Sequence, residues 1–218
     1  MRSLKIALCV VVAAGALGVI APPRAGAGGY SLTVSGGAGM PTSDQATLYD
    51  TGWNVSGSVD KAMGPLWSAG LDLGYNTWQG STAFDGTLTA ASYLLGAAPG
   101  STMSATFTSL RYGLHATVTP PIIGPIHPFA RAGVGGYDLT ETTSSTDPAF
   151  TNSALIMDRS KTLFGWNLGA GVDFAAAPTL SIGVMGSYHD VASDKDFGVN
   201  TTWFDVEGRL TFHVPLAK

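Results

Sequence analysis

Apolar and polar residues alternate along most of the chain after residue 30. The stretch WSAGLDLGYNTW (67–78) shows the pattern: up to residue 76, alternate residues from its first position read W, A, L, L and Y, and the others read S, G, D, G and N. A period of two places successive side chains on opposite faces of a β-strand. The stretch is therefore predicted to be a strand with one apolar and one polar face.

Eight runs have this alternation, and each is close to the 9–11 residues that a tilted membrane-spanning strand needs. The connections after the first, third, fifth and seventh runs are longer than the others, which is the order of an up-and-down barrel with long loops at one end. The pattern predicts an all-β fold, an eight-stranded antiparallel up-and-down transmembrane β-barrel. The runs are 30–40, 52–61, 67–78, 108–119, 126–139, 162–175, 180–190 and 203–214.

The long connection 79–107 contains the segment AASYLLG (90–96), which is too apolar for an ordinary solvated loop. It is predicted either to extend the flanking strands beyond the membrane or to form a short flap.

Residues 1–27 have the features of a signal peptide. Arg2 and Lys5 precede an apolar run at 6–21, and the small residues of 25–27 form a cleavage site. Cleavage after Ala27 would leave 28–218 as one barrel domain and would remove Cys9, so that the exported chain has no disulfide or thiol chemistry. The alternative is a retained membrane anchor.

Only 12% of the residues are charged, about half the usual share, and glycine is common at 29 residues. The mean hydropathy is +0.22, yet no apolar run after the N-terminus is long enough for a membrane-spanning helix. Of the 11 basic residues, three lie in 1–27, so the exported chain carries 8 against 15 acidic ones. This balance argues against a nucleic-acid partner.

The polar face is predicted to line the interior, because its residues are small and eight strands leave an interior just wide enough for side chains. Charges of both signs occur on this face, and buried charges must be paired. Asp72 is expected to pair with Arg111, and Glu207 with Arg209, either as a structural plug or as a gate. The predicted interior ions are Asp72, Arg111, Arg131, Asp173, Glu207 and Arg209.

Aromatic residues gather near the ends of the runs, as in the interfacial girdles of membrane barrels. The alternative is the core of a soluble, secreted lipocalin-like carrier, and the export signal favours the membrane. The predicted lipid-facing girdle is Trp53, Trp67, Tyr75, Tyr112, Phe164, Trp166, Phe204 and Phe212, with Tyr30, Trp78, Phe174 and Tyr188 near strand ends as well.

Catalysis would need a nucleophile and a base within reach of each other. Ser187, His189 and Asp190 are close in sequence, but no known motif surrounds them, and the four histidines (115, 127, 189 and 213) lack metal-ligand spacing. No catalytic, cofactor or metal residue is therefore predicted. An outer-membrane hydrolase or acyltransferase that modifies lipids stays open as an alternative.

Five stretches resemble the small outer-membrane β-barrel proteins, the OmpA-like and OmpW-like transmembrane group. They are GGAGMPTSD, YDTGWNVSGSV, GLDLGYNTW, HPFARAGVGGYDL and GWNLGAGVDF. The resemblance covers the whole exported chain and implies a Gram-negative outer membrane, lipid contacts and insertion by the barrel assembly machinery. Many members end on an aromatic residue, whereas here Phe212 is followed by HVPLAK.

The function predicted from these features is that of an integral outer-membrane protein with a structural role, a loop-mediated interaction role or a narrow pore for small solutes. The expected partners are outer-membrane lipid and solutes or surface ligands bound by the loops, among them the polar loop 140–161.

Overall fold

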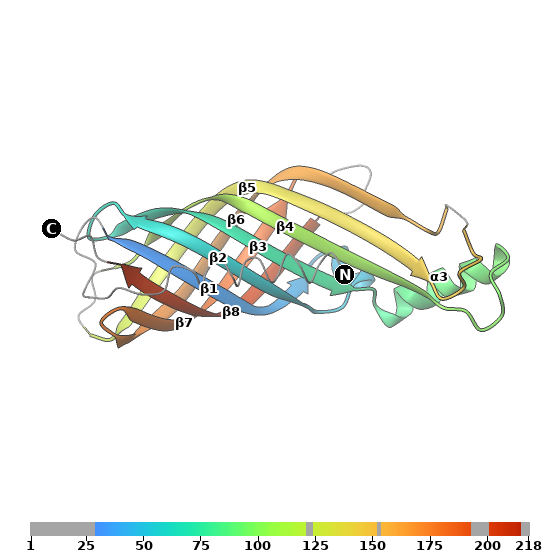
Figure 1. Cartoon of the computed structure of the whole chain (residues 1–218), viewed down its shortest axis with the longest axis horizontal. Helices are drawn as coiled ribbons and strands as arrows, with labels where there is room; N and C mark the ends of the chain where they lie inside the picture. The colour runs from blue at the N-terminus through green and yellow to red at the C-terminus, as the bar shows by residue number, and fades with distance from the viewer. Residues whose placement is uncertain (1–28, 121–123, 152–153, 193–200, 215–218) are drawn as a thin grey trace.

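The computed structural model describes residues 29–120, 124–151, 154–192 and 201–214 (Figure 1). The predicted signal peptide at 1–27 lies outside these residues and stays a prediction. No helix among the described residues is long and apolar enough to cross a membrane.

Eight antiparallel strands form one closed barrel in which each strand pairs with its neighbours in sequence, and the first pairs with the last. The predicted fold class is confirmed, because every predicted run is a strand. The strands are β1 (Tyr30–Pro41), β2 (Gly52–Ala62), β3 (Trp67–Gln79), β4 (Met103–Val118), β5 (Ile126–Ser145), β6 (Asp158–Ala177), β7 (Leu180–Val191) and β8 (Thr201–Val214).

Strands β4, β5 and β6 continue beyond the predicted runs at the end that carries the long loops. They have 16, 20 and 20 residues, whereas the other five have 11–14. The end of β5, TETTSS (140–145), has no apolar face that alternation could reveal. A strand segment that leaves the lipid no longer needs an apolar outer face, so the sequence pattern stops before the strand does.

Two helices lie in the long loops, α2 (Gln45–Leu48) and α3 (Thr82–Leu94). Ser81 caps α3 by accepting a hydrogen bond from the backbone N–H of Phe84, and the Asp85 carboxylate accepts one from the backbone N–H of Ala105 on β4. The connection 79–107 contains the extension of β4 that one of the two predicted alternatives stated. The strand β3, however, ends at Gln79, and residues 82–94 form a helix that the pattern did not predict.

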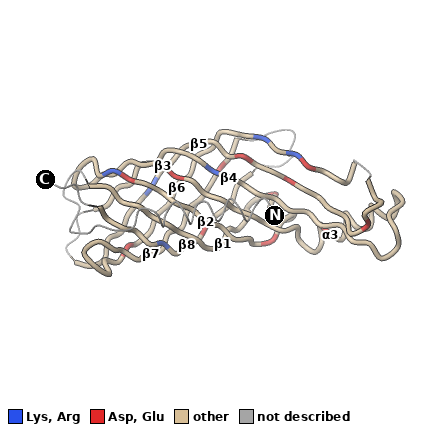
Figure 2. Tube along the Cα trace, in the orientation of Figure 1, with Lys and Arg blue, Asp and Glu red and all other residues tan. Residues whose placement is uncertain are grey.

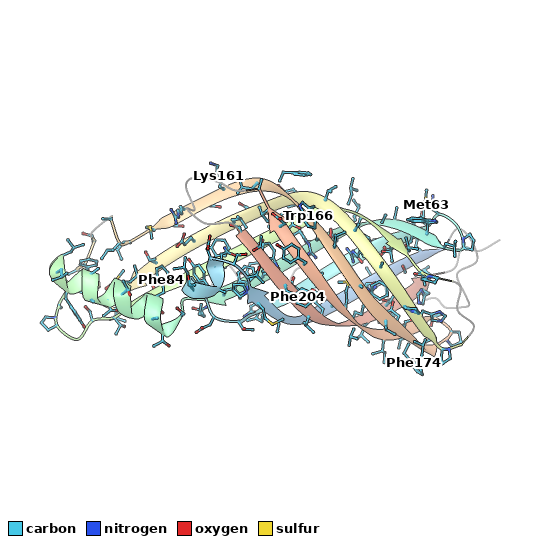
Figure 3. The ribbon with its side chains drawn as sticks, turned by 180° about the vertical axis from the view of Figure 1, so that it is seen from behind. Met63, Phe84, Lys161, Trp166, Phe174 and Phe204 are labelled. Carbon is cyan, nitrogen blue, oxygen red and sulfur yellow. The ribbon has the colours of Figure 1, made fainter. Side chains whose placement is uncertain are left out.

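The outer face of the barrel is apolar over a band of membrane height. Phe164 and Phe174 are ten residues apart on β6, which is about 33 Å along the strand and about 25 Å along the axis at a tilt of ~40°. Seven of the eight predicted girdle aromatics are exposed on this face: Trp53, Trp67, Tyr112, Phe164, Trp166, Phe204 and Phe212. Figure 3 shows Trp166, Phe174 and Phe204 on the barrel wall.

Two aromatic residues differ from this expectation. Tyr75 is only 9% exposed, because the ring of Trp53 lies against it at a centroid distance of 5.6 Å. Trp78 points into the barrel, as its position one residue out of phase with Trp67 and Tyr75 requires. Its placement among the lipid-facing aromatics was wrong.

Leu71 lies midway along the apolar face of β3 and is 62% exposed. We expect Leu71→Arg to destabilise the barrel in bilayers by about 2–4 kcal/mol, because a charge at mid-depth faces hydrocarbon. Urea unfolding in vesicles, followed by heat-modifiable gel mobility, measures this difference.

Leu94→Arg is the matched control, because Leu94 is 88% exposed at the end of α3, beyond the apolar band. The same substitution there should leave stability within about 0.5 kcal/mol of the wild type. Equal effects of the two variants would mean that the β3 face does not meet lipid.

Candidate functional site

The inward face of the membrane-spanning region is lined by polar side chains that lie over glycines. A Cβ on Gly74 would lie 3.0 Å from the Arg111 guanidinium, and one on Gly165 would lie 2.7 Å from the ring of Tyr137. The glycines of the polar face therefore provide the space that large inward side chains occupy. Figure 2 shows basic and acidic residues of the chain distributed along the length of the barrel.

Asp72 is the centre of the ion network in the middle of the lumen. Its Oδ2 atom lies 3.4 Å from Nε of Arg111 and 3.2 Å from Nη2 of Arg131, and its side chain is almost fully buried. The expected contact between Asp72 and Arg111 is present, and Arg131 is a second partner. One carboxylate thus joins strands β3, β4 and β5.

The network continues from Arg131 toward β2. Nη2 of Arg131 lies 2.9 Å from Nδ1 of His115, and Nε2 of His115 lies 2.5 Å from Oδ1 of Asp60. Ser58 donates a hydrogen bond to Asp60. Four adjacent strands are therefore connected by charged and polar contacts across the lumen.

A second cluster lies nearer the long loops, around His189 and Asp205. Oδ2 of Asp205 lies 3.1 Å from Nε2 of His189, and the side-chain amide of Asn76 donates to Oδ1 of Asp205 at 2.8 Å. Nη1 of Arg111 lies 3.1 Å from His189, so Arg111 connects this cluster to Asp72. Sequence reasoning did not assign a role to Asp205, although it occupies the same face as Glu207.

The predicted contact between Glu207 and Arg209 is wrong. Arg209 pairs with Asp173 across the β7 strand, with 3.2 Å between Nε and Oδ1, and its guanidinium stacks over the ring of Phe129 at 4.2 Å. Glu207 instead accepts hydrogen bonds from the hydroxyls of Ser35 and Ser56, and no cation among the described residues pairs with it. Side chains two residues apart on one strand lie about 7 Å apart, whereas the register brings other strands closer.

The Ser187 and His189 side chains do not form a catalytic arrangement. Oγ of Ser187 lies 3.2 Å from Nε2 of His189, which is the same nitrogen that Asp205 contacts. A nucleophile and an orienting carboxylate must occupy opposite nitrogens of the imidazole for the histidine to act as a base. Both residues are buried in the lumen, away from lipid, and Asp190 lies on the opposite face of β7. Among the described residues, no three His, Cys, Asp or Glu side chains are placed to hold a metal ion.

Above the polar network, aromatic rings pack together inside the barrel. Trp78 and Trp203 are 2% and 0% exposed, and their rings meet edge to face at a centroid distance of 5.3 Å. The ring centroids of Phe107 and Trp78 are 5.7 Å apart. The ring of Tyr49, from the loop between β1 and β2, packs against Phe107. We call Tyr49, Trp78, Phe107 and Trp203 the aromatic layer. In the sequence, Trp78 and Trp203 stand where the polar faces of β3 and β8 end, so the alternation itself indicates that both rings point inward.

Tyr49 also ties the aromatic layer to the extended strands. Its hydroxyl donates to Oε1 of Glu141 at 2.7 Å, and Nε of Arg159 donates to Oε2 of the same carboxylate at 2.9 Å. Burial, together with the negative charge of Glu141, raises the pKa of Tyr49 well above its usual range. The phenol therefore remains a hydrogen-bond donor at all physiological pH values.

A family model described as "Outer membrane protein beta-barrel domain" matches residues 7–212. The chain belongs to this outer-membrane barrel family. No curated protein matches it in sequence.

Solved structures of outer-membrane barrels share the fold. Neisserial surface protein A (NspA) has a TM-score of 0.53 and 10% identity, with 84% of this chain and 96% of that chain covered. A major outer membrane protein from Thermus thermophilus has a TM-score of 0.50 and 15% identity, with 84% and 99% covered.

The family and the closed barrel together identify an integral β-barrel protein of the bacterial outer membrane. This excludes the alternative of a secreted lipocalin-like carrier. The family does not specify what the barrel does. The end that carries the long loops is the extracellular end, as in outer-membrane barrels generally.

We expect Asp72→Ala to destabilise the barrel by about 3–5 kcal/mol, because it leaves Arg111 and Arg131 buried without their shared carboxylate. Urea unfolding in vesicles measures the change. Asp44→Ala is the control, since Asp44 is exposed before α2 and its side chain makes no capping hydrogen bond. If the two variants unfolded at the same urea concentration, the ion network would not support the barrel.

Proposed function

We propose that this protein is a closed, non-conducting outer-membrane barrel that anchors a rigid extracellular structure, and that it is not an enzyme. The observation that carries the proposal is the double closure of the lumen, by the ion network around Asp72 and by the aromatic layer above it. The proposed partners are outer-membrane lipid around the barrel, surface ligands at the loops, and the barrel assembly machinery during insertion.

The ion network favours a plug over a pore or a gate. Asp72 is bridged by two arginines from different strands, and Arg111 also contacts His189, so no single side-chain movement would free the lumen. Moving either arginine away from Asp72 would leave a buried charge unpaired, at a cost of several kcal/mol. The interior of an eight-stranded barrel is just wide enough for its own side chains to fill it, which supports a filled lumen.

The aromatic layer adds a second barrier of a different kind. A dry ring cluster opposes the passage of water and ions without any charge that a change of pH or salt would alter. Tyr49 belongs to a loop that is held by Glu141 on β5, so the layer is anchored on both sides of the barrel.

The extracellular end has the features of an interaction surface. The loop that carries α3 is attached to β4 by Asp85, and its tip exposes Tyr93, Leu94 and Leu95 to solvent. Asp147 lies next to this tip and fixes the neighbouring loops by accepting hydrogen bonds from the backbone N–H groups of Ala98 and Ala149. Rigid, partly apolar loops on a stable scaffold are well suited to binding other molecules.

A conductance measurement tests the closed state. In planar bilayers the refolded wild type should give no discrete current steps, and the Trp78→Ala/Trp203→Ala variant should also remain silent, because the ion network still closes the lumen. Adding Arg111→Ala to that variant should give transient currents, since both barriers are then weakened.

Discrete and reproducible current steps from the wild type would contradict the proposal. Heat-modifiable gel mobility of each variant shows whether the barrel has folded before the current is interpreted.

The absence of catalysis is tested separately. We expect the purified protein to release no acyl chains from lipid A or phospholipid in mixed micelles, because the Ser187 and Asp205 side chains share one nitrogen of His189. Acyl release measured by mass spectrometry in the wild type, but lost in Ser187→Ala, would show that the lipid-modifying alternative is correct.

A further inference from the structure

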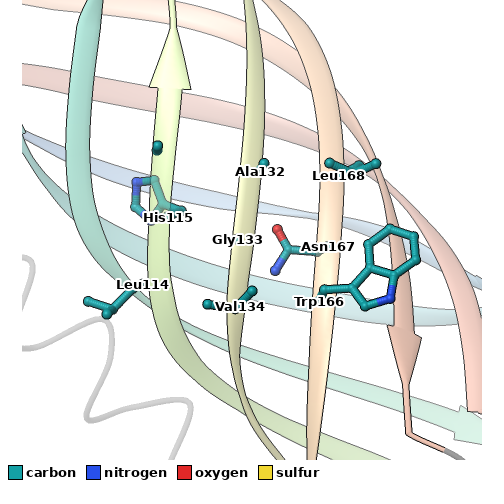
Figure 4. Close-up of a pocket in the computed structure, with 9 residues that line it drawn as sticks. Leu114, His115, Ala132, Gly133, Val134, Trp166, Asn167 and Leu168 are labelled. Atoms are coloured by element: carbon teal, nitrogen blue, oxygen red, sulfur yellow. The ribbon is translucent and has the colours of Figure 1, made fainter.

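The lipid-facing wall is not uniform, and its described part contains a depression of about 450 Å³ on strands β4, β5 and β6. Its outward-facing lining consists of apolar side chains: Leu114, Ala116, Ala132, Val134, Trp166 and Leu168. Figure 4 shows labelled lining residues from all three neighbouring strands. We call this depression the wall groove.

The strand register explains why the groove exists. Leu114, Val134 and Trp166 are partners in one cross-strand row, and the next row contains Ala116, Ala132 and Leu168. Two adjacent alanines thus lie below a row of bulky side chains and beside a leucine. Ala130 and Ala170, which are partners in the following pairing of β5 and β6, continue the low surface away from the long loops.

The groove lies in the half of the membrane nearer the long loops. Trp166 and Leu168 are two and four residues from Phe164, and hence about 5 and 10 Å below it along the barrel axis. Phe164 and Phe174 bound an apolar band about 25 Å high, so the groove faces the hydrocarbon of the outer leaflet.

We propose that the wall groove binds one acyl chain of an outer-leaflet lipid. The groove is continuous with the lipid-facing band, so it is surrounded by hydrocarbon. Its outward lining offers no side-chain hydrogen-bond partner apart from the indole N–H of Trp166. A flexible chain can fill the depression left by Ala116 and Ala132, and gains dispersion contacts that a flat wall does not provide. Trp166 forms the upper edge of the groove, about 5 Å below Phe164 along the barrel axis.

Native mass spectrometry of the full chain in detergent tests this site. The probes are a hexa-acylated lipid A and a phosphatidylethanolamine, each added at equimolar concentration. The wild type should retain one lipid after activation that strips the micelle. Ala132→Phe fills the groove, and its lipid-bound fraction should be at least tenfold smaller than that of the wild type. Retention of lipid A alone would identify a glycolipid source, and retention of both lipids would mean that the chain itself is recognised.

Val206→Phe is the matched control, because Val206 is exposed to lipid on β8, on the other side of the barrel from β4. This variant should retain lipid as the wild type does. Loss of lipid from both variants, or retention of neither probe by the wild type, would overturn the proposal. Heat-modifiable mobility confirms folding, and Ala116→Leu offers a smaller change in the same groove that should also weaken retention.

Fluorescence gives an independent readout in a Trp53→Phe/Trp67→Phe background, where Trp166 is the lipid-facing tryptophan and Trp78 and Trp203 are buried in the lumen. Protein loaded with a lipid brominated in its acyl chains is diluted into detergent. Quenching of Trp166 should persist at least several-fold longer than in Ala132→Phe. Equal recovery times would contradict a bound chain, and neither result depends on whether the lumen conducts.

Discussion

The change of solvent along the barrel axis is the constraint on which the rest of the structure depends. Where the outer wall meets lipid, the inward positions of β4 are Arg111, Gly113 and His115. Farther toward the long loops, the same face of the same strand carries Met103, Ala105 and Phe107, all buried. The inward face is thus polar inside the membrane and apolar above it, because apolar surface is placed against lipid in one region and away from water in the other.

This inversion determines how each region is held together. In the membrane region, hydrophobic burial cannot draw the strands inward, so specific contacts such as Asp72 with two arginines connect them, and glycines provide the space for these side chains. In the extracellular region, the aromatic layer and its neighbours form an ordinary apolar core, covered by α3 and α2. The two kinds of packing meet near His189 and Trp203, whose rings stack with 4.8 Å between their centroids.

The same constraint explains how much the sequence could predict. A period of two and alternating loop lengths were sufficient for eight strands and their order, and adjacency of β3 and β4 was sufficient for the contact between Asp72 and Arg111. The partner of Arg209 could not be predicted, because it depends on the stagger of β6, β7 and β8, which alternation does not encode. Trp78 was misplaced because aromatic content was given more weight than phase, although phase alone puts it inside. The helix α3 was missed because the apolar segment 90–96 was interpreted only in terms of strands and loops.

If the lumen is closed as proposed, the outward surfaces are where other molecules bind, and the structure has two kinds of them. The wall groove exists because Ala116 and Ala132 lie next to a row of bulky side chains, so small side chains outside have a role different from that of the glycines inside. The glycines inside make room for the protein's own side chains, whereas the alanines outside leave room for a molecule that the chain does not supply. The exposed tip of α3 is the second outward surface, and it faces water. Its leucines contribute little to the apolar core below them. Both surfaces lie outside the ion network, so their side chains can change without disturbing the contacts of Asp72.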